Sequence, residues 1–191
     1  MSRKIVHVIG TGTIGESLIG LLCDFKNELG IDEITFHKNT PLTTDRSKVV
    51  SLSKRGARLS THEEKFQGFK DIGLKPEFST ESAIERASVV IDCTPSSYGI
   101  QNKEKYYNKF SKDTLGFISQ GSEFGFGKPY ARGINDKALV RGEDQFIQVV
   151  SCNTHNLSTI VQTLALDESE DNLLDGKFLL IRRSNDVSQS K

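Results

Sequence analysis

The sequence has no excess of charge, few cysteines and no long apolar run, and each lack excludes a class of protein. Lysine and arginine number 25, as do aspartate and glutamate, so no net field attracts nucleic acid or an anionic membrane. The three cysteines have no CxxC spacing and no nearby histidine cluster, which argues against a disulfide framework and a zinc site. No apolar run approaches the length of a membrane span. The composition favours small-molecule partners, with no nucleic acid and no membrane.

The first residues of the chain do not have the pattern of a secretory signal peptide. Residues 1–4 lead directly into an apolar stretch, without the long hydrophobic segment and small-residue cleavage site of a secretory signal. We therefore expect a cytoplasmic protein with reduced thiols. Its 191 residues can bury one good core, or one domain and part of a second.

Strand-like and helix-like segments alternate along the first 150 residues. The expected strands are residues 4–9, 34–37, 57–61, 88–92, 114–119 and 145–150. The expected helices follow the first strand and span residues 43–54, 81–87, 101–110 and, as a short one, 135–140. This alternation predicts an α/β fold with a Rossmann-like, doubly wound, mostly parallel sheet.

A glycine-rich turn, Gly10–Gly15, follows the first strand and opens a helix. The pattern GxGxxG is weak alone, but its place at the start of a βαβ unit supports dinucleotide binding over a purely structural turn. Gly10 permits the tight turn, Gly12 lets the backbone approach a pyrophosphate, and Gly15 lets the helix pack on the strand. We expect the core face of this helix to be Ile14, Leu18, Leu21, Leu22, Phe25 and Leu29.

The residue after the second strand bears on the choice of cofactor. NAD-binding sites carry an acidic residue there for the ribose 2′-OH, but this chain has Lys38. The nearest acids, Asp32 and Glu33, precede the strand and should lie at its opposite end. Lys38 therefore favours NADP over NAD, the alternative being a lysine that is simply solvated.

Thr94 ends the strand at residues 88–92, on the carboxyl edge where open α/β sheets bind ligands. We expect Thr94 to line the cofactor cleft. Cys93, beside it, and Cys23, within the first helix, are expected to be packed core thiols.

Cys152 stands where the strand at residues 145–150 meets a helix. The apolar spacing Leu157, Ile160, Val161 and Leu164 predicts that one face of this helix points into a core. The amide N–H groups at a helix N-terminus stabilise a thiolate, which is the reactive form of cysteine. Cys152 is thus a candidate nucleophile, the alternative being an inert buried thiol. His155, on the same helix, is expected to be solvated or capping rather than a base.

An acidic, turn-prone stretch at residues 167–172 precedes a further expected strand at residues 177–183. That strand does not obviously belong to the parallel sheet. We therefore expect a Rossmann domain at residues 1–150, and the start of a second, α+β catalytic domain at residues 151–191.

Five motifs in this order and spacing resemble those of the archaeal, or type II, glyceraldehyde-3-phosphate dehydrogenases. They are residues 10–15 (GTGTIG), 91–95 (IDCTP), 120–123 (QGSE), 149–154 (VVSCNT) and 181–183 (IRR). The resemblance covers essentially the whole chain and a little over half of a family member.

The resemblance implies that Cys152 attacks the aldehyde of glyceraldehyde 3-phosphate, and that inorganic phosphate releases the resulting thioester as 1,3-bisphosphoglycerate. It implies substrate contacts at Ser151, Cys152 and Asn153. It implies NADP or NAD contacts at Gly10, Gly12, Thr13, Ile14, Gly15, Lys38, Thr94, Gly121, Ser122 and Arg183. Family members form homotetramers.

The chain departs from the family pattern in three ways. Ser122 replaces a second glycine, and His155 and Asn156 replace a small Thr-Gly pair. The family's catalytic histidine and most of its second domain have no counterpart before Lys191, so we expect little turnover by this chain alone. Two alternatives stay open, an inactive NADP-binding Rossmann module and a related semialdehyde dehydrogenase.

Overall fold

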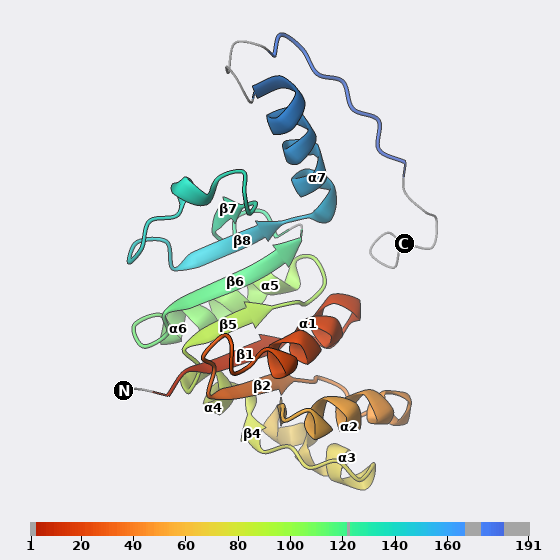
Figure 1. Cartoon of the computed structure of the whole chain (residues 1–191). Helices are drawn as coiled ribbons and strands as arrows, with labels where there is room; N and C mark the ends of the chain where they lie inside the picture. The colour runs from red at the N-terminus through yellow and green to blue at the C-terminus, as the bar shows by residue number, and fades with distance from the viewer. Residues whose placement is uncertain (1–2, 122, 167–172, 182–191) are drawn as a thin grey trace.

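The computed structural model describes residues 3–121, 123–166 and 173–181. Its centre is one eight-stranded sheet in the order β4-β3-β2-β1-β5-β6-β8-β7, in which every neighbouring pair runs parallel (Figure 1). The strands are β1 (Ile5–Ile9), β2 (Glu33–His37), β3 (Arg58–Thr61), β4 (Phe78–Ser79), β5 (Val89–Asp92), β6 (Gly116–Gly121), β7 (Lys128–Tyr130) and β8 (Phe146–Val150). The expected doubly wound α/β fold is confirmed.

Helices connect these strands across both faces of the sheet. They are α1 (Thr13–Asp24), α2 (Arg46–Lys54), α3 (Phe66–Asp71), α4 (Thr80–Glu85), α5 (Tyr98–Asn102), α6 (Asn108–Phe110) and α7 (Cys152–Val161). A π-helical segment, Lys103–Tyr107, joins α5 to α6, and another, Gln162–Leu166, extends α7. No helix in the part of the chain that the structure describes is both long and apolar enough to cross a membrane.

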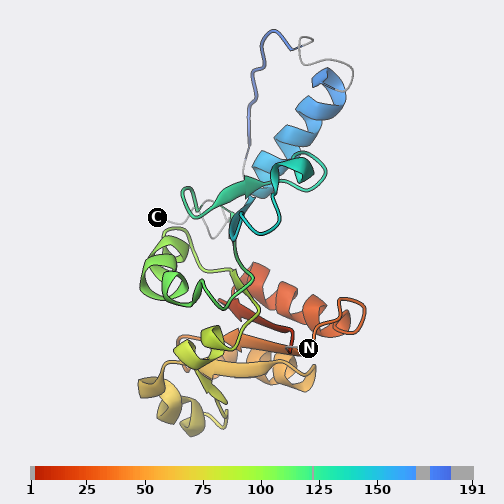
Figure 2. The same cartoon turned by 90° about the vertical axis from the view of Figure 1, so that its left-hand side faces the viewer.

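Two apolar cores form because successive strand residues face opposite sides of the sheet. One core joins Val8 and Phe36 to Ile19 of α1 and Leu52 of α2. The other joins residues of β1, β5 and β6 to the helical segment between α5 and α6, with Tyr107 stacked on Phe117. Figure 2 shows the sheet nearly edge-on, with α1 on one side and α5 and α6 on the other. The central strands β1 and β2 are thus buried on both faces.

The expected core face of α1 is largely wrong. Ile14, Leu21, Phe25 and Leu29 are each at least 45% exposed, and the helix ends at Asp24. The buried residues of α1 are Gly15, Ile19, Gly20 and Leu22. Gly15 lets the start of α1 come close to the turn and to Cys93, and Gly20 lies against the guanidinium group of Arg55.

The segment after β8 differs from the rest of the chain. α7 has no buried residue, and Leu164, expected in its core face, is 80% exposed. Residues 173–181 form no strand, so the strand expected at 177–183 is wrong over its described part; Arg182 and Arg183 lie outside the described residues. Figures 1 and 2 show α7 and residues 173–181 standing away from the sheet. A lone strand has no partner for its backbone hydrogen bonds, so it does not form.

Four short elements differ from the sequence expectations. The structure adds α3, β4 and β7, which the sequence pattern did not reveal. The short helix expected at 135–140 is only the three-residue 3₁₀ turn Asp136–Ala138. β4 and β7 are each three residues or shorter, so they show no period-2 pattern.

The amino-terminal end of the sheet holds a buried ion cluster. Glu33, the first residue of β2, is 3% exposed and pairs with Arg3, Arg58 and Arg86 at 3.0 to 3.2 Å. Burial raises the pKa of Glu33, but the hydrogen bond from Arg86 and the arginine charges outweigh it and lower that pKa. Phe78 lies between the guanidinium groups of Arg58 and Arg86. As expected, this acid lies at the opposite end from the glycine turn.

Candidate functional site

The carboxyl ends of β1, β2, β5, β6 and β8 share one edge of the sheet, because all five strands are parallel. The register pairs Ile9 with both His37 and Asp92, Asp92 with Ser119, and Gly121 with Val150. The segments that follow these strands carry most of the predicted site residues. The fold therefore brings the glycine turn, Lys38, Thr94, Gly121 and Cys152 to one edge.

The three glycines of the turn stand in three different environments. Gly10 has a φ of +96°, and a Cβ there would come 2.8 Å from the carbonyl oxygen of Cys93. A Cβ on Gly15 would lie 2.0 Å from the carbonyl oxygen of Gly10. A Cβ on Gly12 would meet nothing within 4 Å. Gly10 and Gly15 thus shape the turn, whereas Gly12 leaves open space above it.

That open space lies at the N-terminus of α1. Gly12 caps the helix without a side-chain hydrogen bond, and Thr13 and Ile14 are exposed. The first N–H groups of a helix have no partner within the helix and carry its positive dipole end. The turn therefore fits a diphosphate: it is open at Gly12, rich in N–H donors and closed by no side chain.

Lys38 follows β2 and is not simply solvated. Its Nζ lies 2.6 Å from Oδ2 of Asp45, and its side chain is 16% exposed. Asp45 also approaches Lys48, whose Nζ lies 3.8 Å from Oδ1. The hydrogen bond from Lys38 lowers the pKa of Asp45, with help from the charge of Lys48, so the carboxylate is ionised at neutral pH.

Thr94 lies beside the glycine turn, at the end of β5. Its N–H and its hydroxyl both donate to Oδ1 of Asp92, the N–H at 2.9 Å. Oδ2 of Asp92 accepts from Tyr107 and, at 2.9 Å, from Nδ2 of Asn102. Buried Asp92 therefore holds the turn that carries Thr94 in place. Burial raises the pKa of the neighbouring Cys93 thiol to about 12, which fits the expected packed, unreactive thiol.

Glu123 organises the next loop along the edge. Its carboxylate accepts the N–H groups of Ser97, at 2.5 Å, and Ile100, at 3.2 Å. Ser97 has a φ of +76°, a conformation rare outside glycine. A cavity of about 360 Å³ lies here, lined by Ser96, Ser97, Ile100, Gln101, Glu123 and Phe124. Ser122, predicted to contact the cofactor, lies outside the described residues.

Gly121 joins this loop to the cysteine. It has a φ of +80°, and its carbonyl oxygen accepts a hydrogen bond from Nε2 of Gln148 at 2.9 Å. Because Gly121 pairs with Val150, the end of β6 lies beside the residues that begin α7. A Cβ on Gly121 would meet nothing within 4 Å, so this side of the cleft is open as well.

Cys152 is the first residue of α7 and is exposed. The alternative expectation, that this thiol is buried, is therefore wrong. Ser151 caps the helix: its Oγ accepts the N–H of Thr154 at 3.2 Å and lies 2.9 Å from Oγ1 of that residue. The hydroxyl of Ser151 is thus engaged by the helix. Asn153, the other predicted substrate contact, lies in the same first turn.

His155 does not act on Cys152 in this arrangement. Its Nε2 lies 2.9 Å from the carbonyl oxygen of Arg132, so the ring fastens α7 to the chain after β7. The other three histidines are held elsewhere: His7 on Thr35, His62 on Thr80 and His37 against the ring of His62. The chain has four histidines, and the structure describes all of them. No base for the thiol is therefore found among them.

The cysteine and the glycine turn lie on the same edge at different strands. β1 and β8 are separated by three strand spacings, roughly 14 Å in total. The crevice between β1 and β5 is the point where the strand order reverses, and open α/β sheets bind ligands there. Arg183, expected to approach from the second domain, lies outside the described residues.

Sequence reasoning missed two residues of this edge. Asp45 and Lys48 follow β2 by eight and eleven positions, beyond the reach of the usual spacing rule. Nζ of Lys48 nevertheless lies 3.2 Å from the carbonyl oxygen of Thr11 in the glycine turn. The polar run Thr43–Lys48 (TTDRSK), which begins six positions after the strand, was the available signal.

Comparison with known proteins supports the resemblance drawn from the motifs. No protein-family model matches the chain. Curated relatives named glyceraldehyde-3-phosphate dehydrogenase match it at 27% identity in Pyrobaculum islandicum, 27% in Archaeoglobus fulgidus and 30% in Methanobacterium formicicum. These alignments cover 97%, 100% and 98% of this chain, and 51%, 52% and 52% of the relatives. The chain, which spans about half the length of the curated relatives it matches, is thus related to the archaeal-type glyceraldehyde-3-phosphate dehydrogenases and matches their N-terminal half.

Proposed function

We propose that this chain holds a nicotinamide dinucleotide at the glycine turn and presents Cys152 as the nucleophile of an NAD(P)-dependent, phosphorylating aldehyde dehydrogenase. The observation that carries the proposal is the common carboxyl edge. It combines an open helix N-terminus at Gly12 with an exposed cysteine at the start of a second helix. The relatives' name supports glyceraldehyde 3-phosphate as the aldehyde, in preference to a semialdehyde.

Gly10, Gly12, Gly15, Thr13 and Ile14 would hold the diphosphate side of the cofactor. Lys38 would lie towards its adenine ribose, and Thr94 and Gly121 would line the crevice towards the nicotinamide. Ser122 and Arg183 complete the proposed contacts. A bound nicotinamide supplies the hydride acceptor for oxidation of the aldehyde.

In the proposed reaction, the Cys152 thiolate attacks the aldehyde carbon and forms a hemithioacetal. Loss of hydride from that carbon leaves a thioester on Cys152. An oxygen of inorganic phosphate then attacks the thioester carbon, which forms the acyl phosphate and restores the thiolate. Helix N–H groups at the start of α7 stabilise the thiolate in the first and last steps.

The proposed assignment of the chain to two domains follows the same geometry. The end of the sheet at Val150 supports a boundary there, with residues 1–150 as the cofactor-binding domain and 151–191 as the start of the catalytic domain. The four histidines, all of which the structure describes, make their contacts with groups other than the thiol of Cys152. We therefore propose that turnover by this chain alone is low, since losing a general base costs about 10²- to 10⁴-fold in rate.

Two measurements on the chain test the proposal. Titration with NADPH and NADH, followed by nicotinamide fluorescence, should show saturable binding of at least one of them. Iodoacetamide should label Cys152 at pH 8 and leave Cys93 unlabelled, because Cys93 is buried and its pKa is raised to about 12. Cys152→Ser, which keeps the fold, is the matched control for labelling.

The outcomes separate the candidate functions. Binding of neither cofactor would reject both the dehydrogenase and the binding module. Cofactor binding with no faster labelling of Cys152 than of a small thiol would favour an inactive binding module. Aldehyde- and phosphate-dependent NADPH formation at a rate typical of enzymes would contradict the claim that a further base is required.

A further inference from the structure

Three charged side chains beyond β2 form one cluster, Lys38, Asp45 and Lys48. Lys38 leaves the end of the strand, Asp45 ends the 3₁₀ turn Thr43–Asp45, and Lys48 lies in the first turn of α2. The carboxylate of Asp45 lies between the two ammonium groups, 2.6 Å from Lys38 and 3.8 Å from Lys48. Asp45 therefore faces two positive charges, one of which, Lys48, also lies 3.2 Å from Glu16.

Lys48 joins the cluster to the glycine turn. Its Nζ is 3.2 Å from the carbonyl oxygen of Thr11 and 3.2 Å from Oε2 of Glu16, in the first turn of α1. Lys48 thus spans the gap between the end of β2 and the diphosphate side of the turn. In a Rossmann site the adenine ribose lies in that gap.

The two signs of charge in the cluster suit two different cofactors. A carboxylate here accepts hydrogen bonds from the ribose hydroxyls of NAD, and it repels a 2′-phosphate. Ammonium groups attract the 2′-phosphate, which carries up to two negative charges. The lysine side chains are 16% and 25% exposed, and each has a flexible four-carbon stem, so the ammonium groups can turn from Asp45 towards a phosphate.

We propose that Lys48 joins Lys38 in binding the 2′-phosphate of NADP(H), and that Asp45 opposes this binding and favours NAD(H). The inference rests on the proposed function, because it assumes that the glycine turn holds the diphosphate. It adds to that function a pair of residues with opposite effects on cofactor choice. The ratio of the two dissociation constants then depends on the balance between Lys48 and Asp45.

The test is direct titration of NADPH and NADH into the whole chain and three variants, Lys48→Met, Lys38→Met and Asp45→Asn. Each lysine variant should weaken NADPH binding by about tenfold, because one charge-assisted contact to the 2′-phosphate is lost. It should change NADH binding by less than about twofold. Asp45→Asn should strengthen NADPH binding by about threefold or more and weaken NADH binding. Asparagine keeps the size of the side chain and removes only its charge.

Lys54→Met is the matched control. Lys54 lies at the last residue of α2, where it lines a different depression with Val50 and Leu59. It should leave both dissociation constants unchanged. Thermal unfolding of each variant shows whether the fold is intact, and the salt dependence of NADPH binding should fall in Lys48→Met but not in Lys54→Met.

Each result bears on a different claim. An equal loss of NADPH and NADH binding in Lys48→Met would show that Lys48 only supports the turn, and would overturn the inference while keeping the proposed function. An unchanged ratio in Asp45→Asn would overturn the role of Asp45. Binding of neither cofactor by the unmodified chain would overturn both the proposed function and this inference.

Discussion

The two ends of the parallel sheet use charge in opposite ways. At the amino-terminal end, buried Glu33 is surrounded by three arginines, and Phe78 fills the space between two of them. At the carboxyl end, Lys38, Asp45 and Lys48 are partly exposed beside an open glycine turn. The first end gathers three arginines on one buried carboxylate, whereas the second places its charges at the proposed cofactor site. Substitutions at the two ends should therefore separate folding from binding.

Lowering the pH should have the largest effect on stability, through the buried histidines of β1 and β2 and not through the Glu33 cluster. Burial lowers the pKa of His7 and of His37 to about 3, from an ordinary value near 6.5. The unfolded chain therefore binds more protons between those values, and stability present above pH 6.5 is lost progressively as the pH falls towards 3. At pH 5 the loss is about 2 kcal/mol for each histidine.

Urea denaturation at pH 7.5 and pH 5 measures this loss. Glu33 adds nothing to it in that range, because its lowered pKa keeps its contribution intact until the pH falls below the ordinary value for glutamate. His37→Gln should reduce the slope of stability against pH. Equal stability at the two pH values would contradict the burial of neutral histidines in the sheet.

Gly15→Ala should have the next largest effect, at the carboxyl end. The new Cβ would lie 2.0 Å from the carbonyl oxygen of Gly10, so the turn and α1 must move apart. We expect a loss of about 3 kcal/mol in the free energy of unfolding, measured by urea denaturation. Cofactor binding should be lost with it. An unchanged unfolding midpoint would show that the turn is looser than the structure indicates.

Glu33→Gln should destabilise the chain and leave binding intact. It leaves three arginines without their shared carboxylate, and we expect a loss of about 2 kcal/mol, less than for a wholly buried pair because the arginines are partly exposed. Glu77→Gln, which removes an exposed partner of Arg58, is the control and should cost about 0.5 kcal/mol or less. A change in NADPH or NADH affinity in Glu33→Gln would mean that the two ends are coupled.

Gly12→Ala should have the smallest effect on stability and the clearest one on binding. Its Cβ meets nothing within 4 Å and its φ of −73° suits alanine, so the unfolding free energy should change by about 1 kcal/mol or less. Cofactor binding should weaken by about tenfold or more, because the methyl group occupies the approach of the diphosphate. Thermal unfolding and NADPH titration on the same preparation test both parts. Normal binding would reject the glycine turn as the diphosphate site.

Six of the eight strands were predictable, most clearly β1 and β5, because a buried strand of a parallel sheet is typically a short apolar, β-branched run. The buried face of a helix could not be predicted in the same way. α1 packs through Gly15 and Gly20, whereas the sequence pattern counts only large apolar residues such as Leu21 and Phe25. The position of Asp45 was also hidden, because its distance from Lys38 is set by the turn between them and not by spacing along the chain.

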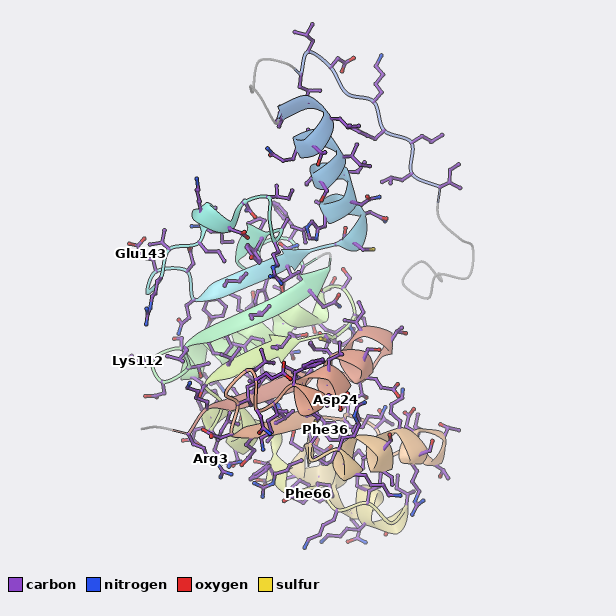
Figure 3. The ribbon with its side chains drawn as sticks, viewed as in Figure 1. Arg3, Asp24, Phe36, Phe66, Lys112 and Glu143 are labelled. Atoms are coloured by element: carbon purple, nitrogen blue, oxygen red, sulfur yellow. The ribbon has the colours of Figure 1, made fainter. Side chains whose placement is uncertain are left out.

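In α7 the apolar residues were identified from the sequence, but none of them is buried. Its apolar stripe is present in the sequence, but burial needs a partner, and Leu164 stays 80% exposed and Ile160 39% exposed among the described residues. Figure 3 shows the contrast: side chains crowd around labelled Phe36 beneath the first helices and fan out freely along α7 and residues 173–181. Sequence periodicity thus indicates which face is apolar, and not what covers it.

α7 is attached to the rest of the molecule at its first turn, the end that carries Cys152. β8 and the contact of His155 with Arg132 hold its first turn, while its ten residues extend roughly 15 Å away from the sheet. Tilting such a rod moves the far end by several ångströms and the attached end hardly at all. Cys152 lies at the attached end of the helix. Its distance from the glycine turn is therefore set by the sheet and does not depend on the orientation of the outer turns.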